Sequence, residues 1–192
     1  MKKVLVLTAH PDDLELACGG TVARFVDEGV EVTNLIVCSN VPHKKYVPES
    51  SKILGFNPLY LEHRDESITR EVVAEIEALI DISSYDLLIT HWKEDWHQDH
   101  RFCHDLGNSL RRKQPLNVWY MNAYPYCQKY TSFEANVFVD ITKYIEQKKN
   151  SILCYKNVPT KWAKDTEHLT AYRGAFIETQ HAEIFKADTL IV

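Results

Sequence analysis

The first two thirds of the chain alternate between short apolar runs and longer segments in which apolar residues recur at every third or fourth position. Apolar runs of this length predict strands that are buried on both faces of a sheet. The spacing of three and four predicts amphipathic helices. The predicted strands cover residues 4–8, 30–38, 59–61, 86–90, 117–121 and 136–139. The predicted helices cover residues 14–28, 49–54, 68–82, 99–112 and 141–155, and glycines at 29 and 55 suit the ends of the first two.

The pattern becomes less regular after Pro159. Residues 171–185 are expected to form a helix that runs into a loop, and residues 189–192 a short strand. Strands that alternate with helices are parallel and are joined by right-handed crossovers, which places helices on both faces of the sheet. We therefore predict a single α/β domain over residues 1–192, with a Rossmann-like, doubly wound, mostly parallel sheet of about five or six strands.

Two polar clusters follow the first and the fourth predicted strands. His10, Asp12 and Asp13 come directly after the first strand, and the segment HWKEDWHQDH, residues 91–100, comes after the fourth. In a Rossmann-like strand order these two strands are neighbours, and the winding direction reverses between them. Ligands bind at that point, beyond the carboxyl ends of the strands. We therefore expect the two clusters to meet in one crevice.

Imidazoles and carboxylates in one crevice suit a hydrolytic metal site. Two imidazoles and one carboxylate can hold a divalent cation and leave coordination positions open for water and substrate. A second carboxylate can accept the proton of the attacking water, and a further histidine can stabilise an oxyanion or protonate a leaving amine. A phosphoesterase that uses the same cluster is the alternative, although such enzymes commonly bind two metal ions.

A simpler interpretation applies to each of these residues alone. Asp13 and Asp99 both stand where a helix is predicted to begin, so either could serve only as a helix cap. The occurrence of both clusters at the expected places favours the metal site.

Two motifs within these clusters resemble those of a known family. The stretch AHPDDLELACGGT, residues 9–21, resembles AHPDDxExxxGGT, the N-terminal signature of the LmbE-like, or PIG-L, deacetylases. Residues 97–100, HQDH, resemble the second motif of that family, HxDH, which often has proline where this chain has Gln98. The resemblance extends to about residue 156. It implies a Rossmann-like fold and removal of an acyl group, in particular acetyl, from the nitrogen of an N-acetylglucosamine-type conjugate.

The resemblance also implies a set of metal ligands. By their places in the two motifs, His10, Asp13 and His100 correspond to the ligands of one metal ion. The ion is expected to be zinc, with another divalent cation such as Fe(II) as the alternative.

The remaining motif residues correspond to catalytic groups. The resemblance implies that Asp12 is the general base and that His97 stabilises the oxyanion or protonates the leaving nitrogen. Asp99 is expected to orient His97. Glu15, in the first turn of the first helix, is expected to support the site without binding the metal.

Residues beside the motifs are candidates for binding substrate. The ring of Trp96 could stack on a sugar, with core packing as the alternative. Arg64 follows the third predicted strand and could bind a hydroxyl or a phosphate, with a surface salt bridge as the alternative. Gly19 and Gly20 lack the surrounding pattern of a nucleotide-binding loop, so we expect them to allow a close approach between helix and sheet.

The composition of the chain restricts the classes of partner that it is expected to bind. The net charge of −5 argues against a nucleic-acid partner, because phosphate binding needs a concentrated basic surface. No apolar stretch approaches the length of a membrane span. The five cysteines form no CxxC motif, which is typical of reduced thiols in a cytoplasmic protein. The expected partner is a small N-acylated molecule, and the tyrosine-rich segment 120–130 is a candidate interface of a homo-oligomer.

Overall fold

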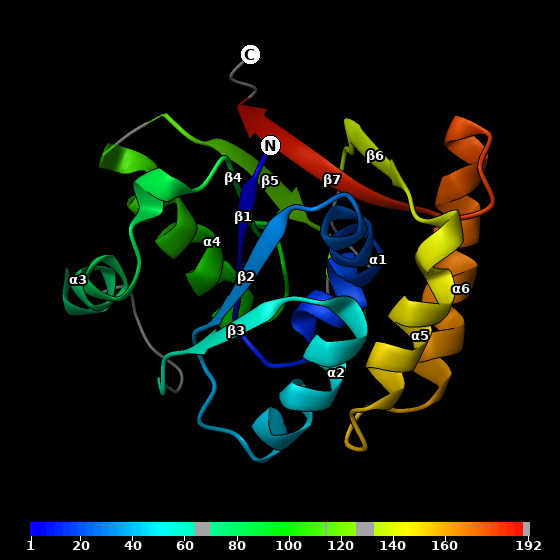
Figure 1. The fold of residues 1–192 in the computed structure, drawn as a ribbon, viewed down its shortest axis with the longest axis horizontal. Coiled ribbons are helices and arrows are strands. Elements are labelled where there is room, and N and C mark those ends of the chain that lie inside the picture. The colour runs from blue at the N-terminus through cyan, green and yellow to red at the C-terminus, as the bar shows by residue number, and fades with distance from the viewer. Residues whose placement is uncertain (64–69, 114, 126–132, 190–192) are drawn as a thin grey trace.

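The computed structural model describes residues 1–63, 70–113, 115–125 and 133–189, and a seven-stranded sheet runs through its centre (Figure 1). The strand order is β3-β2-β1-β4-β5-β7-β6. The strands are β1 (Lys3–Thr8), β2 (Glu31–Ile36), β3 (Asn57–Tyr60), β4 (Leu87–His91), β5 (Asn117–Met121), β6 (Val137–Asp140) and β7 (Ala182–Thr189). Strands β1 to β5 pair in parallel, whereas β7 is antiparallel to both of its neighbours. The predicted doubly wound α/β fold is confirmed.

Helices cover both faces of the sheet (Figure 1). The α-helices are α1 (Asp13–Asp27), α2 (Val47–Leu54), α3 (Arg70–Leu79), α4 (Gln98–Leu110), α5 (Ile145–Leu153) and α6 (Lys161–Gly174). Short 3-10 helices are η1 (Pro42–Tyr46), η2 (Ile82–Ser84), η3 (Arg111–Lys113), η4 (Thr142–Tyr144) and η5 (Ala175–Ile177). The helices α3 and α4 pack on one face, and α1, α2, α5 and α6 pack on the other.

The apolar run of β1 explains why helices cover both faces of the sheet. Successive side chains of a strand point to opposite faces. Val4 and Val6 contribute to the core beneath α1, while Leu5 and Leu7 contribute to the core beneath α4, and all four are fully buried. A strand that is apolar at every position therefore lies in the middle of the sheet, which brings its carboxyl end to the reversal between β1 and β4.

The prediction for the C-terminal part of the chain was wrong. Residues 171–185 were predicted as a helix that runs into a loop and residues 189–192 as a strand, whereas α6 ends at Gly174 and β7 already begins at Ala182 and continues to Thr189, between β5 and β6. Residues 190–192 lie outside the described part. The sequence of β7 is not an apolar run, because it contains the fully buried Glu183. The Glu183 carboxylate is paired with Lys148, which is distant in the sequence. This strand also raises the strand number from the predicted five or six to seven.

Other boundaries differ in detail. The segment 39–48, for which no strand or helix was predicted, contains η1, and the predicted helix 141–155 is divided into η4 and α5. In the described part of the chain, no helix combines the length and the apolar character needed to traverse a lipid bilayer.

Helix α1 is broken at Cys18, whose φ and ψ of −138° and 18° are not helical. Because of the break, two backbone carbonyl groups in the first half of the helix lack their usual helical N–H donors. The Nζ atom of Lys148, on α5, donates to these carbonyls, at 2.8 Å from the oxygen of Glu15 and 3.0 Å from that of Leu16. A buried ammonium thus replaces the missing helical hydrogen bonds.

In the second half of α1, a buried carboxylate accepts hydrogen bonds from backbone N–H groups. The backbone N–H groups of Gly20 and Thr21 donate to Glu183 at 3.0 and 2.6 Å. Glu183 and Lys148 form a fully buried ion pair at 2.6 Å. A Cβ atom on Gly20 would lie 2.7 Å from Ile141, so this glycine permits a close approach, as expected, but to the segment after β6. The first turn of α1 is therefore positioned by residues from the C-terminal third of the chain.

Candidate active site

The first motif forms the turn between β1 and α1. Asp13 begins the helix, and its Oδ2 atom accepts a hydrogen bond from the backbone N–H of His10 at 2.7 Å. A carboxylate at this position is favoured by the partial positive charge of the helix N-terminus. Asp12 is the N-cap residue, but its side chain forms no capping hydrogen bond. The turn therefore leaves the Asp12 carboxylate available to the adjoining cavity, which it lines.

The second motif forms the start of α4. His97 is the N-cap residue, and its Nδ1 atom accepts from the backbone N–H of Asp99 at 3.3 Å. His100 lies in the first turn of the helix and is almost completely buried. Asp99 is thus not the helix cap.

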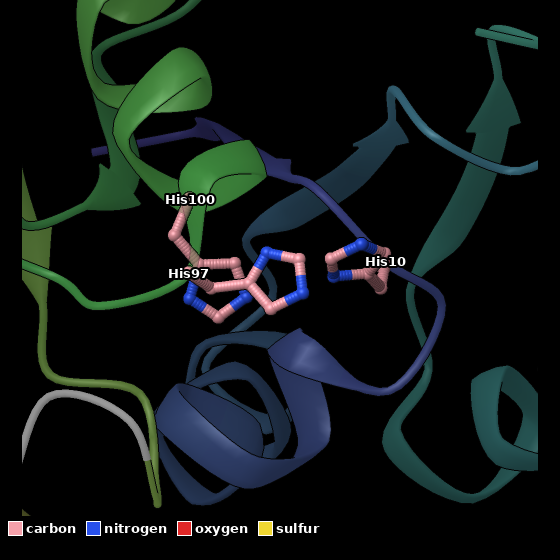
Figure 2. Close-up of side chains that lie close together, drawn as sticks. All are labelled: His10, His97 and His100. Atoms are coloured by element: carbon pink, nitrogen blue, oxygen red, sulfur yellow. The ribbon is translucent and has the colours of Figure 1, made fainter. Parts of the chain in front are cut away.

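The two motifs meet, as the predicted strand order requires (Figure 2). The ring centroid of His10 lies 4.6 Å from that of His97 and 5.5 Å from that of His100. One nitrogen atom from each of the three rings lies within 4.8 Å of the others. Because β1 and β4 are adjacent, residues about ninety positions apart in sequence form one imidazole cluster.

Asp13 lies at the centre of this cluster. Its carboxylate oxygens are 3.1 Å from Nε2 of His100, 3.3 Å from Nε2 of His91 and 3.5 Å from Nδ1 of His10. The structure therefore places the Asp13 carboxylate beside both of the other expected ligands, His10 and His100, whose ring centroids lie 5.5 Å apart. It also adds His91, because Asp13, His91 and His100 form a second group whose donor atoms lie within 4.8 Å of one another.

The electrostatics of the cluster follow from its buried carboxylates. Burial alone would lower the pKa of His10, but hydrogen bonds with Asp13 and Asp99 raise it to about 10. Burial also opposes charge on His100, whereas Asp13 and Asp95 raise its pKa to about 9. Burial would raise the pKa of Asp13, yet the neighbouring imidazoles hold it well below its usual range. The carboxylates thus stabilise positive charge at this position.

Asp12 differs electrostatically from its neighbour Asp13. Burial of the carboxyl group and repulsion by the Asp13 charge raise the pKa of Asp12 to about 6. Adjacent carboxyl groups in one turn are therefore suited to different tasks, because one stays ionised among the imidazoles and the other can accept a proton near neutral pH.

Asp99 lies between two histidines. Its Oδ2 atom is 2.9 Å from Nε2 of His10 and 3.8 Å from Nδ1 of His97. Its nearer side-chain partner is therefore His10, whereas the resemblance implies that it orients His97.

Two residues behind the cluster belong to the site although the sequence suggested no specific role for them. Asp95 is buried, accepts from Nδ1 of His100 at 2.9 Å and accepts from the backbone N–H of His97 at 2.8 Å. His91 is fully buried, and its ring stacks on His100 with centroids 4.0 Å apart. Both residues belong to the polar segment 91–100, in which neither was predicted to contact a metal ligand.

A cavity of about 830 Å³ opens beside the cluster. Asp12 and His97 line it, and so does Trp96, whose surface is 53% exposed. Arg64, the other candidate for substrate binding, lies outside the described residues. The volume lies within the range of sites for small organic ligands. A carboxylate and imidazole cluster beside such a cavity, at the reversal point of a doubly wound sheet, is the arrangement of a metal-dependent α/β enzyme.

Comparison with known proteins identifies the family. The model of the PIG-L family, described as GlcNAc-PI de-N-acetylase, matches residues 5–110, which include both motifs and more than half of the chain. The chain belongs to this family, and the prediction of an N-deacetylase of the LmbE-like, or PIG-L, type is confirmed.

Two of the relatives that follow are named as deacetylases, and one solved structure shares the fold. Diacetylchitobiose deacetylase of Thermococcus kodakarensis is 23% identical over 218 residues, which cover 95% of this chain and 82% of the relative. The conserved protein TT1542 of Thermus thermophilus is 24% identical, with a TM-score of 0.86 and coverage of 100% and 97% of the two chains. The chain spans 62% of the length of another relative, an uncharacterised deacetylase of Escherichia coli K12 that is 27% identical over 115 residues.

The fold alone does not determine the reaction. The structure of 4-carboxy-2-hydroxymuconate hydratase from Pseudomonas putida KT2440 has a TM-score of 0.87 to this chain at 14% identity, and the match covers 100% of this chain and 98% of the hydratase. The family assignment therefore depends on the family model and on the two motifs.

Proposed function

We propose that the protein is a divalent-metal-dependent hydrolase that removes the acetyl group from the nitrogen of an N-acetylglucosamine-type sugar conjugate. The observation that carries this proposal is the meeting of both family motifs beside one cavity, which Asp12 and His97 line. The family model and the diacetylchitobiose deacetylase relative support N-deacetylation as the reaction.

His10, Asp13 and His100 would hold the metal, for which zinc is the first candidate and Fe(II) the second. The residues fit a cation, because the Asp13 carboxylate already contacts an imidazole nitrogen of each histidine, and nitrogen and carboxylate oxygen are ligands that zinc accepts. A bound divalent cation would polarise the amide carbonyl of the substrate and make water a better nucleophile.

The remaining residues would carry the proton transfers. Asp12 accepts a proton from the water as its oxygen attacks the acetyl carbon. His97 donates a hydrogen bond to the oxyanion that forms. When the carbon–nitrogen bond breaks, the proton is delivered to the leaving nitrogen, so that one water and one amide give acetate and a free amine. Asp12 and His97 both line the cavity, which places them within reach of a bound substrate.

A direct test combines activity with metal content. Acetate release from N-acetylated sugars is expected to stop after chelation and to return on addition of zinc. His10→Ala, Asp13→Ala and His100→Ala should each lower the metal bound per chain, because each removes one of three ligands. The control is His168→Ala, an exposed histidine on α6. Unchanged metal content in all three ligand variants would rule out this site, and phosphate release with two metal ions per chain would support a phosphoesterase instead.

A second prediction concerns Asp95, which orients His100 through Nδ1. Asp95→Ala should weaken zinc binding by about 10- to 100-fold, because a carboxylate behind a ligating histidine fixes the ring and its tautomer. Glu94→Ala, at the exposed neighbouring position, serves as the control. Equal zinc affinities of the two variants, measured by competition with a chelating dye, would contradict the assigned role of Asp95.

The proposed partner is a small N-acetylated sugar conjugate, and the proposed location is the cytoplasm. Assembly into a homo-oligomer through segment 120–130 stays a prediction, because residues 126–130 lie outside the described part of the chain.

A further inference from the structure

The cavity continues from the histidine cluster to two aromatic residues that the motifs do not include. Tyr124 follows β5, and Trp162 lies in the first turn of α6. Both line the same cavity as His10 and Asp12. With about 830 Å³, the cavity has room for more than one sugar ring.

The two aromatic rings are fixed to each other. Their centroids lie 5.7 Å apart, and the rings meet edge to face at 87°. The hydroxyl group of Tyr124 donates to Asp165, three residues after Trp162 on the same helix, at 2.6 Å. Trp162 also packs against the core that contains α1 and α5. Because these rings are already held in place, little conformational entropy would be lost when a ligand packs on them.

Outside the two motifs, the described polar side chains that line the cavity belong to asparagines, histidines, a cysteine and Tyr124, while the Asp165 carboxylate that accepts from Tyr124 does not line it. Asn40 and Asn157 line the cavity with amide groups. Burial lowers the pKa of His43, another residue of the cavity wall, which favours its neutral form. Among the described lining residues there is no lysine or arginine. Aromatic faces and amide groups suit the C–H faces and hydroxyl groups of a sugar ring, whereas a phosphate or carboxylate would find no permanently charged cation among the described lining residues.

We propose that Tyr124 and Trp162 form a second subsite, which binds an uncharged sugar ring attached to the N-acetylated residue that is hydrolysed. The inference rests on the proposed function, since it assigns the acetyl group to the end of the cavity that Asp12 and His97 line. The substrate class is thus an uncharged oligosaccharide or glycoside of N-acetylglucosamine, in preference to the free monosaccharide or a sugar phosphate.

Three probes test this assignment in the zinc-loaded protein. We expect kcat/KM for acetate release to be at least about tenfold higher for N,N'-diacetylchitobiose than for N-acetylglucosamine or N-acetylglucosamine 1-phosphate. Trp162→Ala should lower the value for the disaccharide by about tenfold, mainly through KM, because the lost contact binds substrate and transition state alike. The value for the monosaccharide should stay unchanged.

Two variants separate stacking from structural damage. Trp162→Phe keeps an aromatic face and should retain most of the disaccharide preference. Tyr172→Ala changes an aromatic residue on the same helix that is 66% exposed and does not line the cavity, so both substrates should react as in the wild type. Calorimetry of N,N'-diacetylchitobiose with the metal-free protein supplies a readout without turnover, in which Trp162→Ala should raise Kd by a similar factor.

The contrary outcomes are distinguishable. Equal losses on monosaccharide and disaccharide in Trp162→Ala, or a preference for the sugar phosphate, would overturn the subsite and leave the deacetylase intact. Absence of acetate release from all three probes by the wild type would overturn the proposed function. An unchanged Kd in Trp162→Ala would then overturn the subsite as well, while a raised Kd would show a sugar-binding site with a different activity.

Discussion

Replacing Asp12 by asparagine is expected to lower kcat by about 10²- to 10⁴-fold while leaving the metal content unchanged. The asparagine side chain has nearly the same shape but cannot accept the proton of the attacking water. Asp13, but not Asp12, belongs to a group of side chains whose donor atoms are close enough to share a metal ion. Metal binding should therefore persist in Asp12→Asn. The measurement is acetate release under saturating substrate, with metal determined on the same samples.

Asp13→Asn provides the matched comparison at the neighbouring position. Its loss of activity should be accompanied by loss of metal, because Asp13 contacts His10, His91 and His100. If Asp12→Asn retained wild-type turnover, the proton acceptor would have to be another group. If Asp12→Asn lost the metal instead, Asp12 would have to be reassigned as a ligand.

Replacing Lys148 by methionine should lower the free energy of unfolding by about 3–5 kcal/mol. The substitution leaves the Glu183 carboxylate buried without its cation and removes the donor to the carbonyls of Glu15 and Leu16. Urea denaturation followed by circular dichroism measures the change.

The adjacent lysine is the control. Lys149 forms ion pairs with Glu146 and Glu167 at the surface, and pairs of this kind contribute little, so Lys149→Met should change stability by less than about 1 kcal/mol. The double variant Lys148→Met with Glu183→Gln should be less destabilised than the sum of the two single variants, because no unpaired charge is left. Indistinguishable midpoints for Lys148→Met and Lys149→Met would show that the buried pair does not stabilise the break in α1.

The fold could be predicted wherever local pattern and burial agree. The run from Val4 to Leu7 is apolar on both faces, so a central strand follows from the sequence alone. The position of the two motifs at adjacent strand ends follows from the same argument, and the separation of His10 and His100 agrees with it. These features could be predicted without knowing which distant residues contact each other.

The features that were not predicted from the sequence depend on contacts between distant parts of the chain or on side-chain direction. Strand β7 contains Glu183, whose burial makes sense only beside Lys148, and that residue belongs to another predicted helix. His91 and Asp95 stood in the correct segment, but their roles depend on which way each side chain points from β4 and the loop after it. Pairing between charges and the direction of loop side chains are properties of the assembled molecule, so the order of residues did not indicate them.

The position of β7 has a consequence for biosynthesis. Because Glu183 binds the backbone of Gly20 and Thr21, contacts separated by 163 and 162 residues complete the helix that carries Asp13. On the ribosome, the N-terminal strands can emerge and pair early, but this helix lacks its anchor until residues 182–189 have been translated. Contacts of such long range also slow folding. A nascent or prematurely terminated chain that ends before β7 should therefore lack a correctly formed version of the proposed metal site, although it contains every motif residue.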